Sequence, residues 1–444
     1  MVASALAYWL LALAAVLFAA AAWAPPLQTA AVVLDLGVLI LFIADYLYTA
    51  KPKVLRATRL TSDRLSIGQQ NDVELHVYNE GGPTLRCKLR DDYPIAIKSD
   101  VREFAFSVAE NGVSRLKYNL LPRRRGAYEF GKINLRYLSA LRLFWRDVKI
   151  ASSQSVKVYS DLKALHDLSV KLSKSAELGE LNQKKRGQGT DFSSLREYTV
   201  GDDAKAIDWK ATARRDRPVV RTYEVEQEQR MLILIDAGRM MVSDLEGLSR
   251  FDHALNAALC LALTGLTRND QVGFGIFADK PLLYLAPRRG KSHMKNILEK
   301  SFAVEPKLVE PDYSAMLSYF AAAQKGRALI VVLTDLTDPM GSQALLAGLA
   351  SLSGRHLPFC VTLKDRQVLA LANSTVEFEN KKAVLEVDMD AAFKRAVAID
   401  LLAQRELSLS VLQRRGCLIL DCPPQDLSTR LVDTYLEIKK RARL

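Results

Sequence analysis

Residues 328–335 read ALIVVLTD, six apolar residues followed by Thr334 and Asp335. A second stretch, MLILID at residues 231–236, is also apolar until it ends in Asp236. Uninterrupted apolar strands of this length are typical of parallel sheets that are buried on both faces. We therefore predict an α/β domain with a mostly parallel sheet over residues 230–444, in which Asp236 and Asp335 follow the carboxyl ends of strands, where such sheets bind ligands.

The rest of this region alternates between strand and helix patterns. Further strands are expected at residues 271–278, 359–363 and 417–420. Helices are expected at residues 248–266, 293–302, 313–324, 343–352, 390–412 and 425–441.

Residues 51–160 have a different pattern. Val73, Leu75 and Val77 alternate with polar residues, and residues 79–83 read NEGGP, a turn sequence. Similar short strands follow at regular spacing. This pattern predicts a small all-β sandwich.

The chain opens with two apolar runs, at residues 3–24 and 27–50, separated by two prolines. Each is about 20 residues long, the length that crosses a bilayer as a helix. We expect two transmembrane helices within residues 1–50, with Asp35 packed against the first span or a partner's helix; a proton or ion path is the alternative role for Asp35. A cleaved signal peptide is the alternative, but the first run has no basic segment before it.

The charges near the second run predict the orientation. No Lys or Arg precedes Lys51, and basic residues follow at Lys53, Arg56, Arg59 and Arg64. The positive-inside rule places such a cluster in the cytoplasm. We therefore expect a multi-pass protein of the bacterial inner membrane whose soluble domains are cytoplasmic.

Composition sets limits on function. The 444 residues carry a net charge of +12 that is spread along the chain, and no nucleic-acid-binding motif accompanies it. The five cysteines show no CxxC spacing, so we expect buried thiols of a reducing compartment. No Ser/His/Asp set, nucleotide loop or zinc pattern is visible. We expect no nucleic acid partner and no catalytic residues.

Residues 187–221 read GQGTDFSSLREYTVGDDAKAIDWKATARRDRPVVR, within a segment from 161 to 229 that is dense in charges of both signs. This stretch resembles the signature of the DUF58 family, a domain of unknown function. The matching positions are Gly187, Gly189, Asp191, Phe192, Arg196, Tyr198, Gly201, Asp202, Asp203, Ile207, Asp208, Trp209, Ala213 and Arg214.

The resemblance implies a von Willebrand factor A-like domain fused to the signature, and an AAA ATPase of the MoxR type as partner. Such a domain usually binds Mg²⁺ through a D-x-S-x-S loop, which here reads DAGRM from Asp236. Gly238 and Met240 replace the two serines. Only Asp236 and Asp335 remain as metal ligands, so we expect no cofactor, or weak Mg²⁺ binding. Arg239 is able to replace the metal by pairing with either aspartate.

Three readings of the signature segment remain open. It can be a structural belt, a partner-docking surface with aromatic and arginine anchors, or a catalytic site. The docking reading uses Gly189, Asp191, Phe192, Arg196, Tyr198, Gly201, Asp202, Asp203, Asp208, Trp209 and Arg214.

We expect a membrane-anchored scaffold or adaptor that works with a MoxR-type ATPase, and with other membrane proteins, in complex assembly. The alternative is a metal-dependent hydrolase that uses Asp202, Asp203 and Asp208 with Asp236. A third possibility is a module that recognises envelope proteins through its β domain, which requires a periplasmic location.

Overall fold

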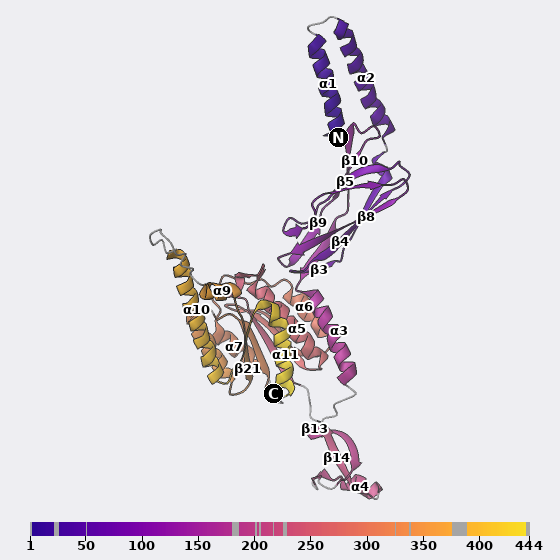
Figure 1. The fold of residues 1–444 in the computed structure, drawn as a ribbon. Helices are drawn as coiled ribbons and strands as arrows, with labels where there is room; N and C mark the ends of the chain where they lie inside the picture. Colours follow the sequence, from indigo (N-terminus) through magenta and orange to yellow (C-terminus); the bar gives the residue numbers. More distant parts are fainter. Residues whose placement is uncertain are drawn as a thin grey trace. The chain divides into compact units, whose positions relative to one another are not determined.

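The computed structural model describes residues 2–21, 26–49, 51–179, 186–199, 202–203, 206–215, 217–224, 229–324, 326–336, 339–374 and 389–440. The chain divides into two compact units, Met1–Asp161 and Leu162–Leu444 (Figure 1).

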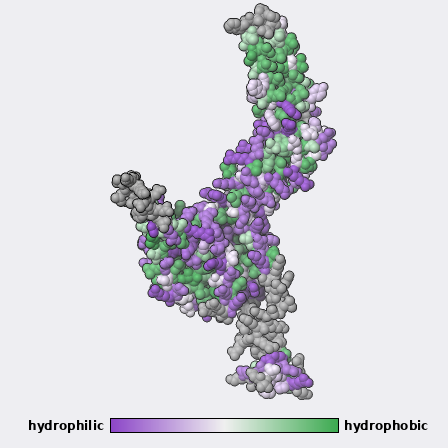
Figure 2. Space-filling model, viewed as in Figure 1, coloured by the Kyte–Doolittle hydropathy of each residue, from purple (hydrophilic) through white to green (hydrophobic). Residues whose placement is uncertain are grey.

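Two apolar helices begin the first unit, α1 (Ala5–Ala21) and α2 (Pro26–Tyr48). Among the described helices, one is long and apolar enough to cross a membrane, over Gln28–Tyr48. With 17 residues, α1 is about 26 Å long, shorter than the hydrocarbon core of about 30 Å. The prediction of two transmembrane helices is therefore wrong, because one described helix, not two, is long enough to cross a membrane. Figure 2 shows hydrophobic residues gathered over both helices.

The β strands of the first unit form three sheets, in the orders β1-β11-β10-β5-β7, β2-β4-β8-β6 and β3-β12-β9. Their bounds are β1 (Val2–Ala3), β2 (Leu55–Leu60), β3 (Arg64–Ser66), β4 (Asn71–Asn79), β5 (Leu85–Asp91), β6 (Ile97–Ser99), β7 (Phe104–Val108), β8 (Val113–Pro122), β9 (Gly126–Phe130), β10 (Ile133–Leu138), β11 (Phe144–Ile150) and β12 (Gln154–Tyr159). A short 3-10 helix, Pro52–Val54, links α2 to β2.

The alternation of apolar and polar residues along the strands explains which side chains form the core of these sheets. On β5, Leu85, Cys87 and Leu89 are buried while the residues between them are exposed. A buried ion pair lies among these apolar residues: the Arg59 guanidinium pairs with Asp91 and lies 4.4 Å from the Phe130 ring centroid. The β-rich part of this unit is thus held by apolar packing around a neutralised ion pair.

The second unit is built on a six-stranded sheet in the order β19-β18-β15-β20-β21-β22. All neighbouring pairs are parallel except β18 with the edge strand β19. The strands are β15 (Arg230–Asp236), β18 (Gln271–Phe277), β19 (Pro281–Arg288), β20 (Leu329–Thr334), β21 (Leu357–Leu363) and β22 (Leu418–Cys422).

Successive residues of these apolar strands point to opposite sides of the sheet, so both faces are apolar and helices cover both. One face packs against α3, α5, α6 and α11, and the other against α7, α8 and α10. The helices are α3 (Leu162–Gly179), α5 (Arg250–Thr267), α6 (Lys291–Ser301), α7 (Tyr313–Ala322), α8 (Pro339–Leu352), α9 (Arg366–Asn373), α10 (Met389–Arg414) and α11 (Pro424–Lys440). Small elements follow β15: the 3-10 helix Arg239–Val242, β16 (Asp244–Leu245) and β17 (Leu248–Ser249).

Candidate functional site

Asp236, the last residue of β15, is fully buried. Its Oδ2 accepts hydrogen bonds from Tyr313 Oη and Thr334 Oγ1, each at 2.7 Å, and its Oδ1 accepts one from the Gly238 backbone N–H at 2.7 Å. Burial raises the pKa of this carboxyl, although the three donors oppose the shift. Both oxygens are therefore occupied by donors from the protein itself.

The loop before α7 closes over this carboxylate. Lys307 N–H donates to the Ala237 carbonyl at 2.7 Å, and Arg239 N–H donates to the Val309 carbonyl at 2.9 Å. A Cβ atom added at Gly238 would lie 2.8 Å from Cδ of Pro311. The position of the first missing serine therefore has no room for a side chain.

Asp335 follows β20 at the same edge of the sheet and is also buried. Arg250, the first residue of α5, donates from Nη1 to Asp335 Oδ2. Arg405 of α10 donates from Nη1 to Asp335 Oδ1 at 2.8 Å. The Leu336 backbone N–H adds a further bond to Oδ1 at 2.9 Å. Two guanidinium groups thus take the position that a cation would need.

Each of these arginines also reaches an outer carboxylate. Arg250 Nη2 donates to Asp365 Oδ2 at 3.0 Å, and Arg405 Nη2 donates to Asp421 Oδ1 at 2.7 Å. The side chains of the two arginines are only 9% and 7% exposed. Although burial alone lowers the pKa of Arg405, Asp335 and Asp421 raise it above its usual value. The resulting network joins α5 and α10 to the ends of β20 and β22.

These residues do not fit a divalent cation. Hard cations need several free oxygen ligands, but the oxygens of Asp236 and Asp335 already accept hydrogen bonds. Among the described residues, no group of three or more His, Cys, Asp and Glu side chains is placed to hold a metal ion. The role that the sequence suggested for Arg239 is also wrong: its Nε lies 2.6 Å from Glu310 Oε2, and Arg250 and Arg405 pair with Asp335.

The signature segment forms an antiparallel hairpin of β13 (Arg186–Glu197) and β14 (Val219–Glu224), with the helix α4 (Trp209–Arg215) between them (Figure 1). Gly189, Asp191 and Phe192 lie on β13, where Asp191 pairs with Glu224 and Phe192 with Tyr223. Gly201 lies outside the described residues.

Asp202 is held by the turn that follows β13. Arg196 forms a two-pronged ion pair with its carboxylate, with Nη1 at 2.7 Å from Oδ2. The backbone N–H and Oγ1 of Thr199 each donate to Oδ2 at 2.9 Å. These donors, Arg196 first, lower the pKa of Asp202 well below its usual value. This carboxylate is thus ionised and bound within its own turn.

Asp208 begins α4. Its Oδ1 accepts hydrogen bonds from the backbone N–H groups of Lys210 at 3.0 Å and Ala211 at 3.1 Å, as a helix cap does. Its neighbour Trp209 is 71% exposed. Asp203 and Arg214 are exposed, and Tyr198 is partly exposed. Asp202 and Asp208 therefore shape the segment, while Trp209 faces solvent.

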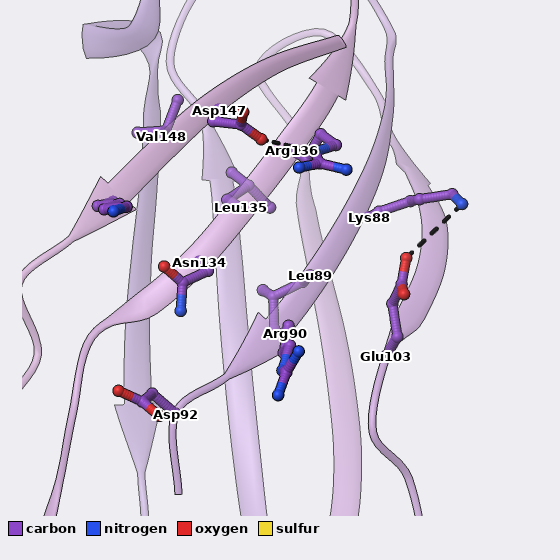
Figure 3. A pocket seen from close by; sticks show the side chains of 11 residues that line it. Lys88, Leu89, Arg90, Asp92, Glu103, Asn134, Leu135, Arg136, Asp147 and Val148 are labelled. Carbon is purple, nitrogen blue, oxygen red and sulfur yellow. Dashed lines mark hydrogen bonds and ion pairs between the residues drawn. The ribbon is translucent and has the colours of Figure 1, made fainter. Parts of the chain in front are cut away.

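A groove of about 470 Å³ lies on the outer face of β5, β10 and β11 in the first unit (Figure 3). Two ion pairs cross it, Lys88 with Glu103 at 3.6 Å and Arg136 with Asp147 at 2.5 Å. Sequence reasoning missed this groove, although alternating basic residues on β5 were a visible sign. It equally missed Arg250 and Arg405, because their partners lie far away in sequence.

Part of the chain matches the model of a protein family. Residues 194–407, slightly less than half of the chain, match the family described as "Protein of unknown function DUF58". The resemblance predicted from residues 187–221 is confirmed to that extent. The von Willebrand A-like domain stays a prediction.

Curated relatives are themselves named as uncharacterised proteins. Proteins Mb1516 of Mycobacterium bovis and Rv1480 of Mycobacterium tuberculosis are each 22% identical over 217 residues, which is 48% of this chain and 65% of theirs. The chain thus spans less than two thirds of the length of these relatives. Their names add no activity.

Two solved structures show weak similarity. An aerotolerance-related membrane protein from Bacteroides fragilis is 17% identical, with a TM-score of 0.30, and covers 48% of this chain and 99% of its own. The hypothetical protein BatB from Bacteroides thetaiotaomicron is 13% identical, with a TM-score of 0.30, and covers 48% of this chain and 100% of its own. TM-scores this low decide nothing about the fold or function of this chain.

Proposed function

We propose that this chain is a membrane-associated docking protein whose signature hairpin, β13 and β14 with α4, binds a protein partner. The apolar helix α2 is consistent with membrane association. The basic residues that follow it, Lys51 and Lys53 first, favour a cytoplasmic position for the soluble part.

The exposure of Trp209 carries this proposal. A tryptophan that is 71% exposed stabilises its own domain little, yet it offers a large, rigid contact area. Tryptophan and arginine are the residues that most often dominate binding at protein interfaces. Trp209 lies on α4 beside exposed Lys210 and five positions before exposed Arg214. Such a face fits a partner with an apolar pocket that is bordered by carboxylates.

The hydrolase reading has less support. It needs carboxylates that are free to bind a metal or to exchange protons. Asp202 is bound by Arg196 and Thr199, Asp208 caps α4, and Asp236 is enclosed. We therefore propose that these aspartates are structural and that the chain is not an enzyme.

We propose a MoxR-type AAA ATPase as the partner, because the DUF58 resemblance implies one and no geometry argues against it. The six-stranded sheet with its helices would then be a von Willebrand A-like support for the hairpin. Its two buried aspartates are bound by arginine, tyrosine and threonine side chains, which supports docking without a metal.

A binding experiment tests this function. The full chain in detergent is immobilised, and the dissociation constant of a purified MoxR-type ATPase from the same organism is measured. We expect Trp209→Ala to weaken binding about 30-fold or more, the usual effect of removing a dominant interface residue. Phe393→Ala is the matched control, because Phe393 on α10 is 69% exposed. Equal affinities for Trp209→Ala and wild type would contradict the proposal.

A second variant tests the enzyme reading. Asp202→Asn removes a negative charge but keeps the size of the side chain. If hydrolysis of any phosphate ester or peptide substrate by the purified chain is found and is lost in Asp202→Asn, while circular dichroism is unchanged, the structural assignment of Asp202 is wrong.

A further inference from the structure

The end of α2 is fixed to the turn between β10 and β11. Asp45, three residues before the last residue of α2, is fully buried. Its carboxylate accepts hydrogen bonds from Ser139 Oγ at 2.5 Å, Leu141 N–H at 2.7 Å and Leu143 N–H at 3.2 Å. Thr49 Oγ1 also accepts a bond from the Ala140 N–H at 3.2 Å. The depth of α2 in a bilayer therefore sets the depth of this turn.

The beginning of α1 is held at the same place. Strand β1 pairs with β11, with Val2 opposite Trp145, and Ser4 N–H donates to the Leu143 carbonyl at 2.9 Å. Large exposed aromatic residues gather at this end of the two helices: Tyr8, Trp9, Tyr46 and Tyr48. Tyrosine and tryptophan prefer the boundary between lipid chains and water. This end of α2 thus has the composition of a membrane interface.

Basic residues accompany these aromatic ones, and we call them the basic collar: Lys51, Lys53, Arg142 and Arg146. The first three are exposed and form no ion pair within the described part of the chain. Arg146 lies over the Tyr46 ring, 5.2 Å from its centroid. Since the turn from Ser139 to Leu143 contacts Thr49, the collar residues of the turn and those just after α2 surround one helix end.

We propose that the basic collar binds the headgroups of anionic phospholipids. This inference rests on the membrane association proposed above, because α2 is what brings the collar to the lipid. A Lys or Arg near an anionic membrane surface strengthens attraction about fivefold. The collar places four such charges at the depth of the phosphates, and its aromatic neighbours hold that depth. A site for a soluble phosphate would not need the apolar helices and exposed aromatic side chains that lie next to the collar.

The groove of Figure 3 provides an internal comparison. Arg90 and Lys149 line this groove and are both opposite Asn134 in the strand register, one on each neighbouring strand. Both are exposed, and neither forms an ion pair among the described residues. Lys149 is four residues beyond Trp145 on β11, about 13 Å along the strand. The headgroup layer is only about 5–8 Å thick. Arg90 and Lys149 therefore carry the same charge beyond the headgroups.

The test measures which lipid contacts the reconstituted full chain. A Trp209→Phe background leaves tryptophans only in the N-terminal unit. Their fluorescence is quenched in mixed vesicles of phosphatidylglycerol and phosphatidylcholine, with one or the other lipid brominated. The ratio of the two quenching curves gives the preference for the anionic lipid. Two double variants are compared, Lys53→Gln with Arg142→Gln and Arg90→Gln with Lys149→Gln, which change the net charge equally.

We expect the wild type to prefer phosphatidylglycerol, the collar variant to lose at least fivefold of that preference, and the groove variant to keep it. Equal losses in both variants would show general charge attraction and overturn the proposal. Equal quenching by both lipids in the wild type would overturn it as well, while leaving membrane association intact. No quenching by either lipid would instead contradict the insertion of α2, and the collar proposal with it.

Discussion

Replacing Arg405 by methionine tests the arginine network at the sheet edge. The side chain of Arg405 is 7% exposed. Methionine fills a similar apolar volume but donates no hydrogen bond. The substitution removes bonds to Asp335, to Asp421 and to the Leu363 carbonyl, which are 2.8, 2.7 and 2.8 Å long.

The expected loss of stability depends on the hydrogen bonds that the two carboxylates keep after the substitution. Asp335 keeps Arg250 and the Leu336 N–H, and Asp421 keeps Thr362 Oγ1 at 2.9 Å. Asp335 thus loses its partner on Arg405 in a buried place, and Asp421 loses its own in a half-buried one. Removing one partner of a buried ion pair typically costs about 3–5 kcal/mol. Because Arg250 still neutralises Asp335, we expect about 3 kcal/mol, the lower end of that range.

Hydrogen exchange measures this cost directly. Peptides from β20, β21 and β22 are followed by mass spectrometry in the full chain in detergent. A loss of about 3 kcal/mol makes their amides exchange more than 100-fold faster, since 1.4 kcal/mol is a factor of ten. Peptides from the β strands of the first unit should not change.

The matched control is an exposed pair. Arg217→Met removes the ion pair with Glu197, whose side chains are 73% and 68% exposed. Such pairs contribute little, so exchange in the strands of the sheet should stay within a few-fold of wild type. If Arg405→Met has an equally small effect, the network does not hold the sheet edge and the reasoning fails.

Three further predictions concern single carboxylates and the missing serines. Burial raises the pKa of Asp236, so the folded state holds the proton of this carboxyl more tightly than the unfolded state does. Relative to Asp236→Asn, the melting temperature of the wild type should therefore fall as the pH rises above about 4, the pKa of an aspartate in the unfolded chain; melting temperatures that change in parallel with pH would contradict this. The double variant Gly238→Ser with Met240→Ser should be about 1–3 kcal/mol less stable than the wild type, because the new side chain at position 238 is crowded against Pro311. Mg²⁺ should not raise its melting temperature; a rise would mean that this edge of the sheet is open to cations. Asp45→Ala should make the β10–β11 turn a target of limited proteolysis in detergent, while Asp45→Asn protects it partly; unchanged cleavage in both would show that Asp45 does not fix α2.

The strands of the α/β sheet were predictable because they are continuous apolar runs. The run at residues 328–333 forms β20 (Leu329–Thr334), and the run ending in Asp236 forms β15. The edge strand β19 was missed because its residues are only partly buried and lack such a run. Helix α3 was missed inside the charged segment, although Leu165 and Leu172 lie on its buried side.

The candidate site was only partly predictable. The sequence indicated two aspartates at one sheet edge and the loss of both serines. It did not indicate which arginine pairs with Asp335, because Arg250 and Arg405 are 85 and 70 residues away. Arg239 was the nearby choice, and nearness in sequence was misleading. The two N-terminal apolar runs show a similar limit, because both have the composition of a membrane span but one described helix, over Gln28–Tyr48, is long enough to be one.

The most direct test of a closed, metal-free sheet edge is a calorimetric titration of Mg²⁺ and of Mn²⁺ into the full chain in detergent. Asp236→Ala is compared with Asp279→Ala, which removes an exposed carboxylate from the turn after β18. The account predicts no saturable binding that depends on Asp236. One cation per chain, bound by wild type and Asp279→Ala but not by Asp236→Ala, would contradict it.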